Sequence, residues 1–156
     1  AEHLVAHLVE MKPKGFKNAH GMHGECVGIG TIMCARAYHE LAKRDTIEVK
    51  PYEPLDPAWV RDVFGDLADG IFKENENDVL KTFPPENIKE HWQEIRDVIA
   101  TIPTAEELIG LYTKIGAKHS LAELDIDESI RGEFLDISSA IRNRLTFARM
   151  TRLIVK

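Results

Sequence analysis

The chain has 156 residues, of which 44% are hydrophobic and 29% charged, with a formal net charge of −6. This length suffices for one domain with one sizeable core, and the mildly acidic balance argues against nucleic acid and anionic membranes as partners, since both attract clustered Lys and Arg. No apolar run approaches the roughly 18 residues that span a bilayer, and the first ten residues do not resemble a signal peptide. Cys26 and Cys34 are too few for a disulfide framework, so we expect buried free thiols in a cytoplasmic protein.

The first half of the sequence shows two helical patterns separated by a loop. Residues 2–11 place apolar side chains at helical spacing, and Pro13 and Gly15 then interrupt the pattern in a basic loop. From about Gly24 to Lys43 the sequence is apolar with few charges and several small residues. This composition predicts a buried central helix that neighbouring elements approach closely.

A proline-rich connector follows at 46–57, and Asp56 before Pro57 is typical of an N-cap at the start of the next helix. Pro84 and Pro85 begin a further pattern that predicts one helix through about Ala100, with its apolar residues on one face.

The last third of the chain is predicted to be helical as well. Thr104 and Glu107 fit a capping box at the start of a helix that ends at Gly116. Two final helices are expected to begin near Asp127 and Arg144. Because strand patterns of period two are essentially absent, we predict a single all-α domain, a helical bundle, over residues 1–156.

Histidines gather at the beginning of the chain, where four of the seven lie within the first 23 residues. His3 and His7 are four residues apart, so a helix places them on one face, and His23 lies just before the buried helix. Imidazoles are suitable ligands for Zn, Ni and Fe(II). By itself this spacing is more often a surface pair than a pair of ligands, and two histidines are too few for a complete metal site.

Taken together, these segments resemble the C-terminal domain of the iron-containing alcohol dehydrogenase and dehydroquinate synthase-like superfamily. The family's His-x3-His helix is similar to the segment AEHLVAHLVE. Its His-Gly-Glu, which opens a long glycine-containing helix, is similar to the segment HGMHGECVGIGTI. IPTAEELIGLYTKIGA and LAELDID continue the similarity, and IRNRLTFARM resembles the closing helix of the sn-glycerol-1-phosphate dehydrogenases. The resemblance covers essentially the whole chain but only the back half of a family member. It implies a preceding Rossmann-like nucleotide-binding domain, which this chain lacks.

The resemblance also implies roles for particular residues. His3 and His23 would ligate a divalent metal, most readily Zn, with Ni or Fe as alternatives. The third ligand, an aspartate or glutamate, would come from the preceding domain. His7 would act as the catalytic residue beside the substrate, through hydrogen bonding or proton transfer. Glu25 would lie at the helix start and orient a ligand histidine.

The reaction implied by the resemblance is the NAD- or NADP-linked reduction of dihydroxyacetone phosphate to sn-glycerol 1-phosphate. Its partners would be its own N-terminal domain, which binds the nucleotide, the small phosphorylated substrate, and further copies in a homo-oligomer. A basic loop containing Lys17, together with Arg142 and Arg144, favours a phosphorylated substrate, since a phosphate dianion needs hydrogen-bonded cations. Without the nucleotide-binding domain and the third ligand, the isolated chain is expected to be inactive.

Three alternatives stay open at this point. One is 3-dehydroquinate synthase, although the chain has no adjacent pair of lysines like the pair in that enzyme's substrate-binding segment. Another is glycerol dehydrogenase, in which the loop before His-Gly-Glu is usually less basic. The third is a non-catalytic helical domain that binds metal for structure or sensing.

Overall fold

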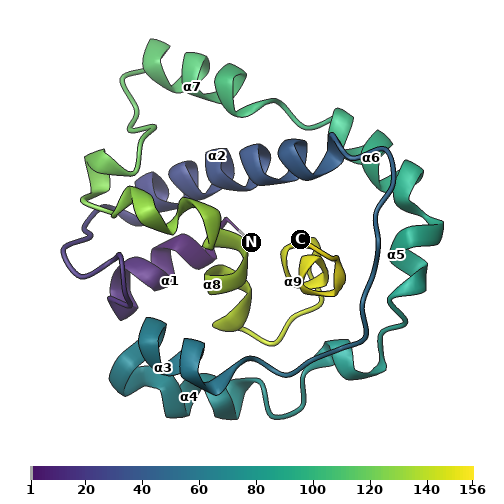
Figure 1. The fold of residues 1–156 in the computed structure, drawn as a ribbon. Helices are drawn as coiled ribbons and strands as arrows, with labels where there is room; N and C mark the ends of the chain where they lie inside the picture. The colour runs from purple at the N-terminus through teal and green to yellow at the C-terminus, as the bar shows by residue number, and fades with distance from the viewer. Residues whose placement is uncertain (1) are drawn as a thin grey trace.

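The computed structural model describes residues 2–156 and confirms the all-α prediction (Figure 1). Within that range no β-strand forms, and extended backbone pairs at one antiparallel bridge between Val49 and Ile154. The α-helices are α1 Leu4–Met11, α2 His23–Ala42, α3 Pro57–Phe64, α4 Ala68–Glu74, α5 Glu86–Glu90, α6 Trp92–Ala100, α7 Ala105–Lys114, α8 Phe134–Ala140 and α9 Phe147–Met150. Short 3-10 helices lie at Gly65–Leu67, Val79–Thr82, Ala122–Leu124, Glu128–Gly132 and Thr151–Leu153.

The 20-residue helix α2 is the longest element, and α1, α6, α7 and α8 all pack against it. Its buried residues are Cys26, Ile29, Gly30, Ile32, Met33, Cys34 and Ala35. The prediction of a buried central helix is therefore confirmed, as is the prediction that both cysteines are buried free thiols. Burial raises the pKa of the Cys34 thiol to about 11, so this group is protonated at neutral pH.

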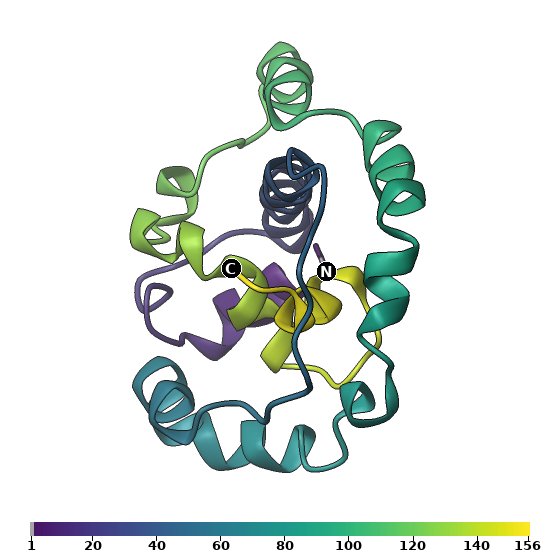
Figure 2. The same cartoon turned by 45° about the vertical axis from the view of Figure 1, so that its right-hand side comes forward.

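Two hydrophobic clusters form the interior. The larger one joins α1 and α2 to α3, α4 and the C-terminal third of the chain. The smaller one contains Ile47, Leu80, Ile88, Trp92, Leu153 and Ile154. It fastens the connector after α2 and the last residues of the chain to α5 and α6, which Figure 2 shows along one side of the molecule.

The predicted helix caps are confirmed. The Asp56 side chain accepts a hydrogen bond from Ala58 N at 3.0 Å, with Pro57 as the first helical residue of α3. Thr104 and Glu107 form the expected capping box at the start of α7.

Two predicted helix boundaries are wrong. The helix expected from Pro84 to Ala100 breaks at His91, where Trp92 is buried and its indole N–H donates to Arg44 O at 2.9 Å. The final helix begins at Phe147 rather than near Arg144, because tertiary hydrogen bonds hold the residues before it in a loop.

Across residues 2–156, none of the helices combines the length and the apolar character that crossing a bilayer requires.

Candidate metal centre

The structure brings His3 and His23 together. His3 is the N-cap residue of α1, and His23 is the first residue of α2. Their ring centroids lie 5.5 Å apart with 44° between the ring planes, and both residues are exposed. The predicted proximity of the two imidazoles is confirmed.

A close crossing of α1 over α2 produces this proximity. The backbone of Glu2, directly before His3, lies on Gly30, which is two helical turns beyond His23. A Cβ atom at Gly30 would lie 2.4 Å from the Glu2 carbonyl oxygen and 2.8 Å from the Val5 side chain. Only a residue without a side chain allows the beginning of α1 to approach α2 in this way.

The separation of the two rings suits shared coordination of one ion. An ion about 2.1 Å beyond a ring nitrogen lies about 3.2 Å from that ring's centroid, so two rings on one tetrahedral ion have centroids about 5.2 Å apart. The observed 5.5 Å between His3 and His23 fits this value. Imidazole pairs of this kind are typical donors to Zn, Ni and Fe(II).

The histidine pair by itself could provide only two donors to a metal ion. Among residues 2–156, no three His, Cys, Asp or Glu side chains are grouped so that they could hold a metal together. A catalytic metal typically has three protein ligands and an open position. The remaining positions are thus open to a ligand from outside these residues, to water or to a substrate.

His7, the predicted catalytic residue, lies on α1 one turn beyond His3. Its side chain is 43% exposed, and its Nδ1 lies 3.5 Å from the carboxylate of Glu10. The ring is therefore accessible to a small molecule next to the histidine pair.

Glu25 lies in the first turn of α2, as predicted, and its carboxylate fixes the local backbone. Its Oε2 accepts hydrogen bonds from Met22 N at 2.9 Å and from Lys118 Nζ at 3.1 Å. These bonds, first from the Met22 backbone and then from Lys118, hold the pKa of Glu25 below its usual value. Glu25 therefore fixes the backbone of Met22, the residue before His23, and Lys118, which sequence reasoning missed, binds Glu25 from 93 residues further along the chain.

The basic loop before His23 is largely committed to contacts within the fold. Lys12 donates to Ala19 O, and Lys14 pairs with Asp62 at 2.6 Å. Lys17 is exposed at the edge of a hollow that Asp125 also lines. His20, next to this loop, is exposed and lies 3.2 Å from the Asp125 carboxylate.

Arg142 and Arg144, the predicted phosphate ligands, lie in the loop between α8 and α9 and not on a helix. Between them, Asn143 fastens the loop: its side chain donates to Asn77 O at 2.7 Å and accepts from Val79 N at 2.9 Å. Both arginines are exposed. The helical geometry that would point them to different sides is absent, because tertiary bonds set the path of this loop.

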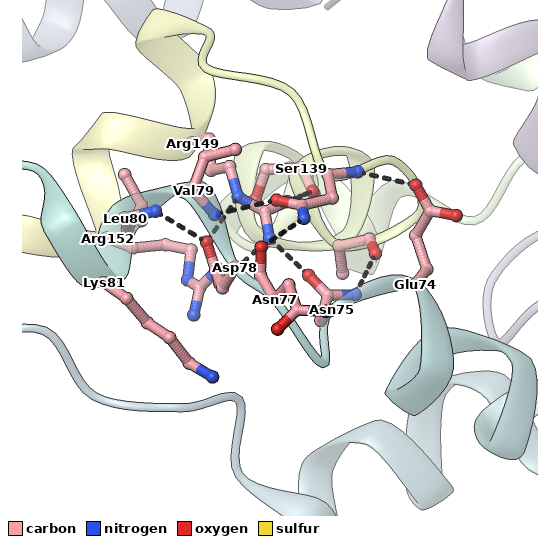
Figure 3. Close-up of polar contacts among 12 residues, drawn as sticks. Glu74, Asn75, Asn77, Asp78, Val79, Leu80, Lys81, Ser139, Arg149 and Arg152 are labelled. Atoms are coloured by element: carbon pink, nitrogen blue, oxygen red, sulfur yellow. Dashed lines mark hydrogen bonds and ion pairs between the residues drawn. The ribbon is translucent and has the colours of Figure 1, made fainter.

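The most extensively bonded arginine is Arg149, on α9, which the sequence analysis did not single out (Figure 3). Its side chain is fully buried, with Nε donating to Asp78 Oδ1 at 3.0 Å and Nη2 lying 2.9 Å from Asp78 Oδ2. Nη1 donates to Ser139 O at 2.6 Å and to Arg142 O at 3.0 Å, and Nη2 also donates to the Asn75 side chain. These bonds fasten α9 to the segment after α4 and to the end of α8.

Comparisons with protein-family models, with curated proteins and with solved structures find no match to this chain. The features of the chain that point to a function are therefore its sequence motifs and the geometry of the His3–His23 pair.

Proposed function

We propose that this chain is the helical, metal-binding half of an NAD(P)-linked polyol-phosphate dehydrogenase of the dehydroquinate synthase-like superfamily. The observation that carries the proposal is the 5.5 Å separation of the His3 and His23 rings. The two motifs that the family resemblance joins, His-x3-His and His-Gly-Glu, meet in space although a loop separates them in the sequence.

In this proposal His3 and His23 hold a divalent ion, which acts as a Lewis acid towards the substrate oxygen when it is bound. The chain's own contribution is orientation. Gly30 lets α1 approach α2, and Glu25 fixes the turn before His23. His7, one turn further along α1, would donate or accept a hydrogen bond to the substrate at one ring nitrogen.

The proposed substrate is dihydroxyacetone phosphate, reduced to sn-glycerol 1-phosphate by NADH or NADPH on a separate nucleotide-binding domain. Lys17, Arg142 and Arg144 are exposed cations and remain the proposed phosphate ligands. Lys12 and Lys14 are less suitable, since both already bind acceptors within the fold.

Metal binding tests the first part of the proposal. We expect His3→Ala and His23→Ala each to weaken Zn²⁺ or Ni²⁺ binding by at least about 10-fold in calorimetric titrations, because each substitution removes one of two imidazole donors. The control is His91→Ala, which removes an exposed histidine 3.3 Å from Glu94 and should leave the affinity unchanged. Equal metal affinity in all three variants and the unaltered chain would refute the metal site.

Substrate preference tests the second part. In a protein that joins this chain to the proposed nucleotide-binding domain, kcat/KM for dihydroxyacetone phosphate should exceed that for dihydroxyacetone by at least about 10-fold, since cations hold the phosphate. A preference for dihydroxyacetone would indicate glycerol dehydrogenase. Phosphate release from the dehydroquinate synthase substrate without net NADH turnover would indicate the synthase. At least one of Arg142→Ala and Arg144→Ala, made separately, should raise KM for the phosphorylated substrate, since both side chains are exposed on the same loop.

A further inference from the structure

Helix α7 packs against the rest of the molecule with one side only. On that side Ala105 is buried, and the Tyr112 ring lies 3.0 Å from where a Cβ atom at Gly28 of α2 would be. On other sides of the helix and just past its end, Leu111 is 54% exposed and Ile115 is 76% exposed. Figures 1 and 2 both show α7 at the periphery of the fold, so this outer face is open to a partner.

The outer face of α7 borders a hollow, and the residue at the centre of this face is a glycine. Glu107, Gly110, Leu111 and Lys114 line a hollow together with the turn at residues 100–103. A Cβ atom built at Gly110 would meet nothing within 4 Å, so the glycine is not required by packing within the chain. A glycine on an exposed helix surface does allow the backbone of another helix to approach closely.

The charges on this face are arranged symmetrically. Glu107 is three residues before Gly110, and Lys114 is three residues after Leu111, so the acid and the base are equidistant from the midpoint between the central two residues. All four residues fall on one side of the helix at 3.6 residues per turn. A face with this pattern is complementary to itself when a second copy is turned by a two-fold rotation.

We propose that two copies of this chain associate through α7, packed antiparallel about a two-fold axis that passes between Gly110 and Leu111. In this arrangement Leu111 of each copy packs over Gly110 of the other copy, where the absence of a side chain leaves room for it. Glu107 of each copy pairs with Lys114 of the other.

The carboxylate of Glu107 is already fixed in position by hydrogen bonds within its own chain. Its Oε2 accepts hydrogen bonds from Thr104 N at 2.8 Å and from Thr104 Oγ1 at 3.0 Å, which fix the carboxylate at the start of the helix. The Thr104 bonds lower the pKa of Glu107, so it carries its charge at neutral pH. A partner of one charge sign would pair with either Glu107 or Lys114 and leave the other unpaired, whereas a second copy pairs both.

The size of the face sets the strength of the association. The helix has 10 residues and is therefore about 15 Å long. A contact along one side of so short a helix buries less surface than the roughly 800 Å² per partner of a standard stable interface. The dimer should accordingly be weak and concentration-dependent, and it should dissociate further at high salt because its ion pairs are at the surface.

Sedimentation velocity across a concentration series tests the dimer. Gly110→Gln and Leu111→Gln should each raise the dissociation constant of the dimer at least about 10-fold. The first adds a side chain where the two helices come closest, and the second removes the apolar contact. Gly110→Gln should also raise the Tm of the monomer, because Gln favours helix more than Gly and the position is open. This opposite change in stability and association distinguishes a contact between copies from damage to the fold.

The matched control is Val98→Gln, which changes a residue that is 63% exposed on α6 and does not line the hollow. It should leave the dissociation constant unchanged. A chain that stays monomeric at all concentrations would overturn the proposal and leave the face to a different partner. A dimer that Gly110→Gln and Leu111→Gln do not weaken would equally overturn it. The measurement needs neither metal nor substrate, so its result is independent of the proposed function.

Discussion

Replacing Arg149 with methionine should lower the free energy of unfolding by about 3 kcal/mol or more, the cost of breaking a buried ion pair by removing one partner. The side chains of Arg149 and Asp78 are both fully buried, and the guanidinium also satisfies two backbone carbonyls and the Asn75 side chain. Methionine fills much of the volume but leaves these acceptors without a donor. Urea-induced unfolding measures the difference.

The control for this prediction is Arg152→Met. Arg152 also binds Asp78, with Nη1 2.9 Å from Oδ2, but its side chain is 10% exposed and Arg149 remains in place. Its loss should therefore cost clearly less, about 1.5 kcal/mol, the lower end of the range for a hydrogen bond to a charged group. If the two variants lost equal stability, the buried hydrogen bonds of Arg149 would not be the main interaction that holds α9 in the fold.

The hydrogen-bonded group of Arg149, Asp78 and Arg152 predicts that the stability of the fold depends on pH in the acid range. Burial by itself raises the pKa of Asp78, but hydrogen bonds from Arg149, Leu80 N and Arg152 outweigh burial and hold the pKa below its usual value. A depressed pKa in the folded state means that the stabilisation is present above the unfolded value of about 3.9 and is lost as pH falls towards the folded value. Removing Arg149 should flatten the dependence of stability on pH in this acid range.

Local signals in the sequence predicted much of the fold, because caps and helical periodicity depend on near neighbours. The Asp56–Pro57 and Thr104–Glu107 helix starts are of this kind, and both are confirmed. Arg149 could not be found in this way. Its partner Asp78 lies 71 residues away, and nothing in the local sequence distinguishes a buried arginine from an exposed one. The misplaced helix start near Arg144 has the same cause, since Asn143 is held by distant backbone groups.

The candidate site was also predictable only in part. The His-x3-His motif together with the following His-Gly-Glu motif predicted that His3 and His23 lie close together, which the structure confirms. The contacts that hold the two histidines in this geometry could not be predicted from the sequence. The Lys118–Glu25 ion pair joins residues 93 apart, and the contact of Gly30 with the Glu2 backbone depends on how two helices cross. The sequence indicated a close approach at the small residues of α2 without identifying the element that makes it.

Gly30→Ala should therefore affect both the fold and the site. The added Cβ would overlap the Glu2 carbonyl oxygen at 2.4 Å and the Val5 side chain at 2.8 Å, so α1 must move away from α2. Overpacking of this kind costs about 1–3 kcal/mol, and the better helix propensity of Ala returns up to about 1 kcal/mol. We expect a net loss of about 1–2 kcal/mol in urea unfolding. Because His3 directly follows Glu2, metal affinity should also fall by at least about 10-fold.

Gly24→Ala is the matched control, since it makes the same substitution in the same helix and directly beside His23. A Cβ atom at Gly24 meets nothing within 4 Å, so the change adds helix propensity without overlap and should leave stability equal or slightly higher. Metal affinity should stay unchanged. If Gly30→Ala kept full metal affinity while losing stability, the approach of α1 to α2 would matter for packing alone. Loss of affinity in both variants would instead point to the start of α2, and not the α1–α2 crossing, as the element that positions the histidines.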